Sequence, residues 1–189
     1  MKVDATPIRK LLILDLDETL LFATEERLDM PEAFIVGQYY VYLRPHLGAF
    51  LAACSARFDI AVWTASSEDY AAAVVARLFA GGPVPKFVWA RDRCTVRSDP
   101  DTREMYRVKD LKKVRAQGYA LEHVIVVDDS TRKHERNYGN LVTVRPFEGD
   151  QADDELVHLE RYLLALADVP NVRAIEKRGW RNRADSGSG

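Results

Sequence analysis

The stretch LLILDLDETL, residues 11–20, decides the fold. Four consecutive apolar residues run directly into Asp15 and Asp17, which are separated by a single leucine. An unbroken apolar run of this length predicts a strand that is buried on both faces, as strands of a parallel sheet are. The two aspartates then lie at the carboxyl end of that strand, where open parallel sheets bind their ligands.

Further apolar runs follow, and segments with helical spacing of apolar residues separate them. The runs are IAVW at 60–63, KFVWA at 86–90, VIVV at 124–127 and LVTV at 141–144. The expected helices are 46–57, 67–79, 109–117 and 153–167, the second with a capping box of Ser66 and Asp69 and the third ended by Gly118. This alternation predicts an α/β fold with a doubly wound, mainly parallel, Rossmann-like sheet.

Two segments do not fit the alternation. Residues 34–43 are expected to be an extended stretch before a turn into the first helix. Residues 91–107 are polar and carry the turn signal Ser-Asp-Pro-Asp at 98–101, which predicts a small inserted β-hairpin. Neither segment leaves room for a large cap domain over the sheet edge.

Size and composition indicate one soluble globular domain. The chain has 189 residues, of which 47% are hydrophobic and 30% charged, with a formal net charge of −2. No apolar run reaches the roughly 18 residues of a membrane span, and no signal peptide is evident, so we expect a cytoplasmic protein without a membrane partner. Cys54 and Cys94 are interpreted as reduced thiols.

The chain is divided into three parts on this basis. Residues 1–7 are an N-terminal extension, and residues 8–170 form the core domain with the hairpin 91–107 inside it. Residues 171–189 are expected to be a basic, flexible C-terminal tail. The sequence does not indicate an oligomeric state.

Polar side chains follow three of the predicted strands. They are Asp15 and Asp17, Thr64 and Ala65, and Asp128 and Asp129. The carboxyl ends of parallel strands meet at one sheet edge, so four carboxylates are expected to lie close together there. Such a cluster is stabilised when it binds a cation or protonates one carboxyl. An oxygen-only ligand set favours Mg²⁺, which in turn favours a phosphate ligand.

Phosphoryl transfer accounts for the remaining residue types. One carboxylate can attack phosphorus and form an aspartyl-phosphate, while a second, two residues away, moves protons to the leaving group and from water. The Thr64 hydroxyl and backbone can bind a phosphoryl oxygen. Lys109 in Val108-Lys109-Asp110-Leu111, expected at the start of a helix, is the best candidate to neutralise charge on the phosphoryl group.

With these motifs in view, the chain resembles the haloacid dehalogenase superfamily, whose first motif is Asp-x-Asp-x-Thr. More narrowly it resembles the phosphatases related to the RNA polymerase II C-terminal-domain phosphatases, also called NLI-interacting-factor-like. The matching pieces, in order, are LDLDETL at 14–20, YLRPHLGAFL at 42–51, VWTAS at 62–66, VKDL at 108–111 and VIVVDDS at 124–130. The resemblance covers about residues 8–167.

The resemblance implies a role for each carboxylate. Asp15 would be the nucleophile and a metal ligand, and Asp17 the general acid and base, with its backbone carbonyl on the metal. Asp129 would be the third protein ligand to Mg²⁺, with Asp128 beside it. Many small members of the family have Asp-Asn at this pair, whereas this chain has Asp-Asp. Which of the two is the direct ligand stays open.

The resemblance also implies that Thr64, Ala65 and Lys109 hold the substrate phosphate. Without a cap the site is open, which favours a macromolecular substrate, most simply a phosphoserine or phosphothreonine protein. The arginines around the hairpin are candidates for recognising a phosphorylated or acidic substrate; they are Arg91, Arg93, Arg97 and Arg103.

Two alternatives remain open at this point. Within the enzyme class, the substrate is a small phosphate ester or a nucleic-acid terminal phosphate. In a different class, the chain is a non-catalytic peptide-binding module, although it keeps both aspartates of the first motif.

Overall fold

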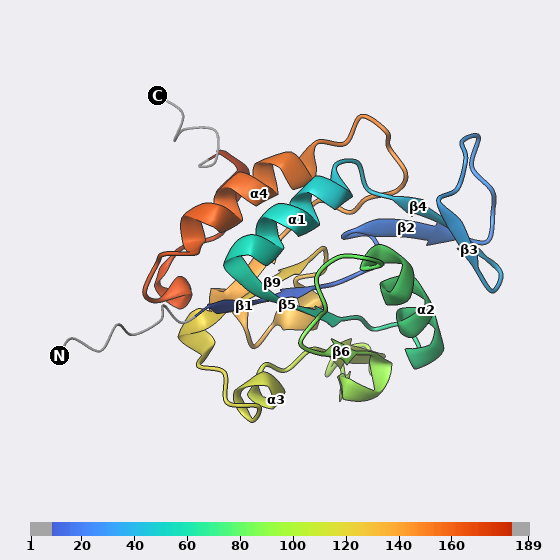
Figure 1. Cartoon of the computed structure of the whole chain (residues 1–189). Helices are drawn as coiled ribbons and strands as arrows, with labels where there is room; N and C mark the ends of the chain where they lie inside the picture. The colour runs from blue at the N-terminus through green and yellow to red at the C-terminus, as the bar shows by residue number, and fades with distance from the viewer. Residues whose placement is uncertain (1–8, 183–189) are drawn as a thin grey trace.

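The computed structural model describes residues 9–182 and has a five-stranded parallel sheet at its centre (Figure 1). In order across the sheet, the strands are β10 (Leu141–Thr143), β9 (Val124–Asp128), β1 (Lys10–Leu14), β5 (Phe58–Trp63) and β6 (Val88–Trp89). Every neighbouring pair in it is parallel. Strand β1 comes first in the sequence and lies in the middle of the sheet, with later strands added on both sides of it, and this confirms the predicted doubly wound α/β fold.

Helices cover both faces of the sheet. On one face lie α1 (Leu47–Arg57), α2 (Glu68–Leu78) and α4 (Glu155–Leu166), and on the other lies the short α3 (Lys112–Arg115) (Figure 1). Residues of β1 alternate between two core clusters: Leu12 and Leu14 pack under α1 and α4, whereas Leu11 and Ile13 pack toward α3. Because both faces are covered, the strand is apolar at every position rather than at every second one.

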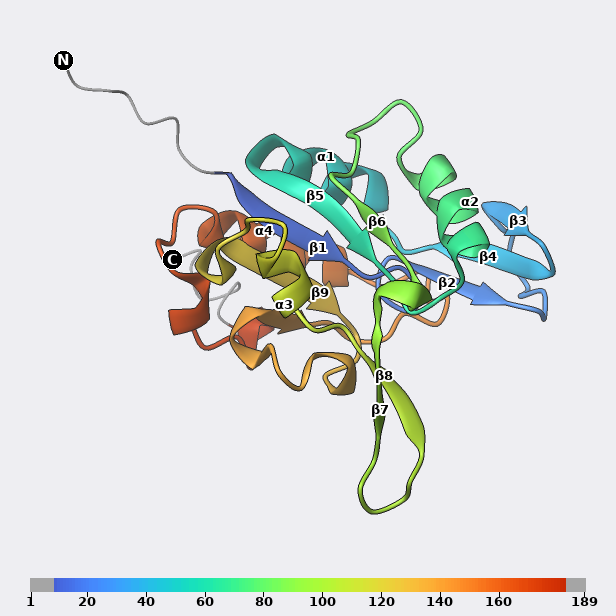
Figure 2. The same cartoon turned by 90° about the horizontal axis from the view of Figure 1, so that it is seen from below.

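Two small antiparallel elements extend the central layers. One is a three-stranded sheet in the order β2 (Leu21–Thr24), β4 (Tyr39–Leu43) and β3 (Phe34–Val36). The other is a hairpin of β7 (Thr95–Ser98) and β8 (Met105–Val108), which projects away from the body of the molecule (Figure 2). The hairpin agrees with the predicted insertion, and residues 9–182 contain no separate cap domain.

Short 3-10 helices complete the fold. They are η1 (Arg91–Arg93), η2 (Leu121–His123), η3 (Arg132–His134), η4 (Tyr138–Asn140) and η5 (Val172–Ala174). Among the described residues, no helix is both long and apolar enough to cross a membrane.

Three local predictions are corrected by the structure. The helix expected over 109–117 is only α3, because Lys109 lies in the preceding loop, where its N–H donates to the Lys133 carbonyl at 2.8 Å. The capping box is absent, since Ser66 precedes the N-cap of α2 and its hydroxyl binds Asp17 instead. Residues 34–43, expected as one extended stretch, form the two antiparallel strands β3 and β4, joined by a turn at 37–38. Strand β2, which sequence reasoning did not predict, pairs with β4.

The expectation of a flexible tail is wrong for residues 171–182. Trp180 is 4% exposed, packs against Tyr162 of α4 at a ring-centroid distance of 5.5 Å, and donates its indole N–H to the Thr143 carbonyl at 2.7 Å. Lys177 is also buried and donates to backbone carbonyls. A buried aromatic ring with a satisfied N–H anchors this segment. Residues 183–189, and the extension 1–7, lie outside the described residues.

Arg44 ties the loop after β1 to the C-terminal part of the domain. Its buried guanidinium forms two 2.8 Å hydrogen bonds to Asp153. It also donates to the carbonyls of Thr19 and Arg145 at 3.0 and 2.9 Å. Arg44 therefore fixes the backbone that follows the two aspartates, rather than facing a ligand.

Candidate active site

The predicted carboxylates meet at the carboxyl ends of β1 and β9. These strands are neighbours with Leu14 opposite Val127, and the Asp15 N–H continues the ladder by donating to the Val127 carbonyl at 3.0 Å. Asp15, Asp128 and Asp129 each offer an oxygen within 4.8 Å of the others. The register of two parallel strands thus brings together residues that are more than a hundred positions apart in the sequence.

Asp128 is the most deeply buried of the three and is held from two sides. Lys109 Nζ lies 2.5 Å from its Oδ2 and 2.9 Å from Asp15 Oδ1. His134 Nε2 lies 3.0 Å from Asp128 Oδ2, and because a carboxylate only accepts, this nitrogen carries the proton. Burial would raise the pKa of Asp128, but Lys109 and His134 outweigh it and hold the pKa well below its usual range.

Sequence reasoning missed two residues at this centre, His134 and Lys133, and Lys133 contacts all three carboxylates. Its Nζ lies 2.9 Å from Asp15 Oδ2, 3.4 Å from Asp128 Oδ1 and 3.5 Å from Asp129 Oδ1. Lys109 therefore occupies one oxygen of Asp15 and Asp128, and Lys133 occupies the other oxygen of each. Nothing in the sequence around Lys133 distinguishes it from a solvated basic turn.

The two lysines do not fully offset the effect of burial on the ionised forms of Asp15 and Asp129. Burial, and next the charge of Asp128, raise the pKa of Asp15 despite Lys109 and Lys133. Burial also raises the pKa of Asp129 to about 7, with Asp128 and Asp15 adding to the effect and Lys133 opposing it. A site with this balance favours the binding of a further cation.

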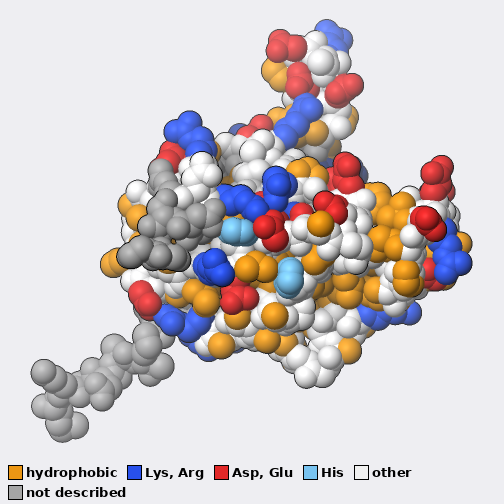
Figure 3. Space-filling model, turned by 90° about the horizontal axis from the view of Figure 1, so that it is seen from above, with side chains coloured by type: hydrophobic (Ala, Val, Ile, Leu, Met, Phe, Trp, Pro, Cys, Tyr) orange, Lys and Arg blue, Asp and Glu red, His pale blue; other side chains and the backbone are white. Residues whose placement is uncertain are grey.

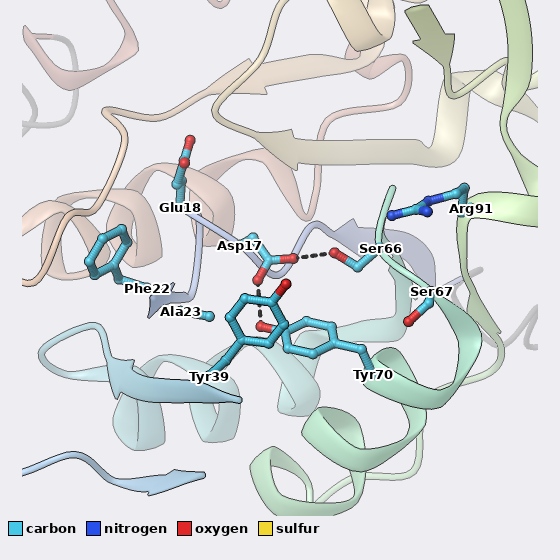
Figure 4. Close-up of a pocket in the computed structure, with 9 residues that line it drawn as sticks. All are labelled: Asp17, Glu18, Phe22, Ala23, Tyr39, Ser66, Ser67, Tyr70 and Arg91. Atoms are coloured by element: carbon cyan, nitrogen blue, oxygen red, sulfur yellow. Dashed lines mark hydrogen bonds between the residues drawn. The ribbon is translucent and has the colours of Figure 1, made fainter. Parts of the chain in front are cut away.

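Asp17 lies at the rim of the site in different surroundings. The Ser66 hydroxyl donates to its Oδ2 at 2.7 Å and the Tyr70 hydroxyl to its Oδ1 at 2.6 Å, so both oxygens accept from neutral groups (Figure 4). Ser66 lies just before α2 and Tyr70 in its first turn. The sequence pattern placed Ser66 in a capping box and gave Tyr70 no role in the site. The motif VWTAS contains Ser66, and Tyr70 follows one helical turn later, so the spacing could have indicated the pair.

Thr64 and Ala65 follow β5 and line a cavity of about 170 Å³ together with Asp15 and Asp17. The Thr64 hydroxyl oxygen accepts the Ser66 N–H at 3.0 Å, which leaves the hydroxyl proton for a ligand. Among residues 9–182, the Ala65 N–H donates to no other group. Lys109, by contrast, is 1% exposed and does not line this cavity.

A second hollow of about 250 Å³ adjoins Asp17 on the side of the three-stranded sheet. Phe22, Tyr39 and Tyr70 form much of its wall, with Glu18 at its edge (Figure 4). In the space-filling view, hydrophobic side chains (orange) lie beside Asp and Glu side chains (red) on this face (Figure 3). The reaction centre is thus continuous with a surface that can bind apolar groups.

The fold and the clustered carboxylates define a phosphatase of the haloacid dehalogenase type, and the comparisons with known proteins agree. The sequence model of the family described as NLI interacting factor-like phosphatase matches residues 10–173. The chain belongs to this family and is a phosphoric monoester hydrolase.

The curated relatives carry similar names. CTD nuclear envelope phosphatase 1B of Danio rerio is 29% identical over 185 residues, which cover 90% of this chain and 72% of that protein. The ubiquitin-like domain-containing CTD phosphatase of Arabidopsis thaliana is 31% identical over 93% of this chain and 52% of that protein. The nuclear-envelope names of several relatives contradict the expected cytoplasmic location.

The solved structure of Fcp1, an essential RNA polymerase II CTD phosphatase, has the same fold. It superposes with a TM-score of 0.55 at 20% identity and covers 95% of this chain. The chain spans about half of that structure, 53% of its length.

Proposed function

We propose that the chain is a Mg²⁺-dependent phosphoprotein phosphatase that forms an aspartyl-phosphate on Asp15. The observation that carries this proposal is the contrast between two carboxylates that are two residues apart. Asp15 is enclosed by lysines and other carboxylates at the bottom of the cavity, whereas Asp17 is held at its rim by two hydroxyls. This contrast suits one carboxylate for attack and the other for proton transfer.

The residues fit a hard divalent cation. The donor set of Asp15, Asp128 and Asp129 consists of carboxylate oxygens only, which Mg²⁺ prefers. Asp129 is the better direct ligand, because Lys109 and His134 already occupy Asp128, and the backbone carbonyl of Asp17 is the expected further ligand. When bound, Mg²⁺ would neutralise charge on the transferring phosphoryl group.

In the first step an Asp15 oxygen attacks phosphorus, and the bond between phosphorus and the ester oxygen breaks. Asp17 gives its proton to that oxygen, so the product leaves as a neutral alcohol. The Thr64 hydroxyl and the Ala65 N–H donate to phosphoryl oxygens, and Lys109 keeps Asp15 and Asp128 oriented.

In the second step Asp17, now a carboxylate, takes a proton from water while the water oxygen attacks phosphorus. The bond between phosphorus and the Asp15 oxygen breaks, which releases inorganic phosphate and restores the carboxylate. The Ser66 and Tyr70 hydroxyls hold Asp17 in one orientation through both transfers, because each oxygen keeps its own donor.

A phosphoprotein is the substrate class that the site supports best. Within residues 9–182 no cap covers the cavity. The cavity adjoins the hollow lined by Phe22 and Tyr39, where an apolar side chain of a peptide could bind. The names of the relatives, which include CTD phosphatases, support the same class.

Steady-state kinetics on purified protein would test this function. We expect Mg²⁺-dependent release of phosphate from p-nitrophenyl phosphate, and a kcat/KM for phosphoserine peptides that exceeds that for a panel of small phosphate esters and 5′-phosphorylated oligonucleotides. Asp15→Asn should abolish both activities. A preference by orders of magnitude for small esters or oligonucleotides would contradict the substrate class, and turnover that is unaffected by chelation would contradict the metal.

A further inference from the structure

A cationic pocket lies beside the reaction centre, between the β7–β8 hairpin and η3. It has a volume of about 300 Å³, and its lining includes Arg91, Arg107, Arg132 and Lys133 but no acidic residue. Lys and Arg side chains lie near the base of the projecting hairpin, next to Asp and Glu side chains (Figure 3). Of these four cations, Arg132 and Lys133 also contact carboxylates outside the lining, so Arg91 and Arg107 are the ones that give the pocket its capacity to bind an anion.

The cationic pocket is continuous with the cavity that holds Asp15 and Asp17. Both are lined by Ala65 and Lys133. One substrate can therefore place its scissile phosphate at Asp15 and a second group in the cationic pocket.

Two of the four cations have donors to spare. The Arg107 side chain has no ion pair or hydrogen bond within residues 9–182, and Arg91 uses only its Nε, on the Ala65 carbonyl at 3.0 Å. Arg132 is different, because it pairs with Asp99 at 2.7 Å and its guanidinium carbon lies 4.2 Å from the Tyr106 ring centroid. Free guanidinium groups bind carboxylate or phosphate through two parallel hydrogen bonds.

The hollow on the other side of the reaction centre is acidic and aromatic where the cationic pocket is basic. The hollow beside Asp17 is lined by Glu18 and by the aromatic rings of Phe22 and Tyr39. Arg91 lies between the two hollows and borders both. A polynucleotide, with a phosphate at every step, would place negative charge against Glu18, whereas a peptide can be acidic on one side and apolar on the other.

We propose that the cationic pocket binds a second acidic group of the substrate, so that the preferred substrate is a phosphopeptide with a phosphoserine or carboxylate on one side of the scissile phosphate. Arg91 and Arg107 are the specificity-determining residues. This inference rests on the proposed phosphoprotein phosphatase function and names the substrate class within it.

A peptide series would test the inference. Each peptide carries one scissile phosphoserine and, at a single flanking position on either side, alanine, lysine, glutamate or a second phosphoserine. For the unmodified protein we expect kcat/KM to rise about tenfold with the added charge on one side and not on the other, and the gain to shrink at high salt. Turnover of the alanine peptides reports the proposed function separately.

Variants assign the effect to the pocket. Arg107→Ala should remove most of the gain, and Arg107→Glu should reverse it, so that a flanking lysine becomes preferred; a merely structural role would not produce this reversal. Arg115→Ala, an exposed arginine on α3 outside the pocket, is the matched control and should keep the gain.

Three results would overturn the inference while leaving the phosphatase activity in place. The first is turnover of alanine peptides with no gain from added charge on either side. The second is a gain that Arg107→Glu leaves unchanged, and the third is a preference for a 5′-phosphorylated oligonucleotide over every peptide. Failure to hydrolyse any phosphopeptide would overturn both the inference and the proposed function.

Discussion

The floor of the site, around Asp15, and its rim, around Asp17, surround their carboxylates with different chemistry. On the floor three carboxylates, Asp15, Asp128 and Asp129, share Lys109 and Lys133. At the rim Asp17 accepts from two neutral hydroxyls. We therefore assign nucleophilic attack and metal binding to the floor and proton transfer to the rim. Two aspartates that are two residues apart thus have different tasks.

Charge balance on the floor shows what a metal would change. One divalent cation and the ammonium of Lys109 would together neutralise the three carboxylates. The charge of Lys133, which contacts one oxygen of each carboxylate, would then no longer be needed to neutralise them. Its ammonium group could instead bind the substrate, because Lys133 lines both cavities. Lys133 and Mg²⁺ are therefore expected to compete for the same oxygens.

The largest effect should come from removing charge at the floor. Asp15→Asn is expected to lower kcat by about 10⁴-fold or more for every substrate, because the nucleophile is lost.

Asp17→Asn, at the rim, should lower kcat by about 10²- to 10³-fold for a phosphoserine peptide. Its effect should be much smaller on phosphorylation of the enzyme by p-nitrophenyl phosphate, because that leaving group needs no proton. Rapid-quench kinetics would separate the two steps.

Circular dichroism and thermal unfolding of both variants provide the control, because Asn keeps the shape of the side chain. Equal losses in the two variants, independent of the leaving group, would show that floor and rim do not have separate tasks.

Lys133→Met gives the next largest effect and tests the competition directly. The Mg²⁺ concentration for half-maximal activity should fall by about tenfold, because the metal no longer displaces an ammonium from Asp15 and Asp129. Lys113→Met is the matched control, since Lys113 lies on α3 and donates to the Arg93 carbonyl. A higher Mg²⁺ requirement in Lys133→Met would mean that Lys133 assists the metal instead.

The strand ends of the floor were predictable from the sequence, and much of the rest was not. Apolar runs that end in aspartates identify Asp15, Asp128 and Asp129, because parallel register brings strand ends together. Lys133 reaches the floor through the path of the η3 loop, which no periodicity encodes.

The rim was misread for a related reason. Ser66 with Asp69 matches a capping box in spacing, but the tertiary contact with Asp17 competes for the same hydroxyl and wins. The C-terminal segment was misread because its basic composition is typical of a tail, whereas one buried ring, Trp180, fixes it to α4. The overall composition of a segment does not reveal whether one of its residues is buried and fixes it to the domain.

The pH dependence of metal binding tests the charge of the floor with a smaller effect. Since the pKa of Asp129 is about 7 without metal, the half-saturating Mg²⁺ concentration should rise about threefold as the pH falls from 7.5 to 6.5. Isothermal titration calorimetry at several pH values measures it, and Asp129→Asn should weaken the dependence. A pH-independent affinity in the unmodified protein would exclude Asp129 as the titrating ligand.

The same shift predicts how chelated protein responds to pH. A carboxyl whose pKa is raised on folding stabilises the fold at low pH and loses that contribution as the pH rises through about 7. The Tm of the unmodified protein in EDTA, relative to that of Asp129→Asn at the same pH, should therefore fall between pH 5 and 8, and Mg²⁺ should restore it at pH 8. An equal change of Tm with pH in the two proteins would contradict the raised pKa of Asp129.

The smallest effect should come from the rim, where one donor can be removed while the other remains. Tyr70→Phe deletes the 2.6 Å hydrogen bond to Asp17 and keeps the one from Ser66, so kcat for a phosphoserine peptide is expected to fall only about twofold. Ser66→Ala should behave similarly, and the double variant should lose more than the product of the two, because Asp17 then has no fixed orientation. If the loss is as large with p-nitrophenyl phosphate during enzyme phosphorylation, the hydroxyls support the floor as well, and the separation of proton transfer from charge does not hold.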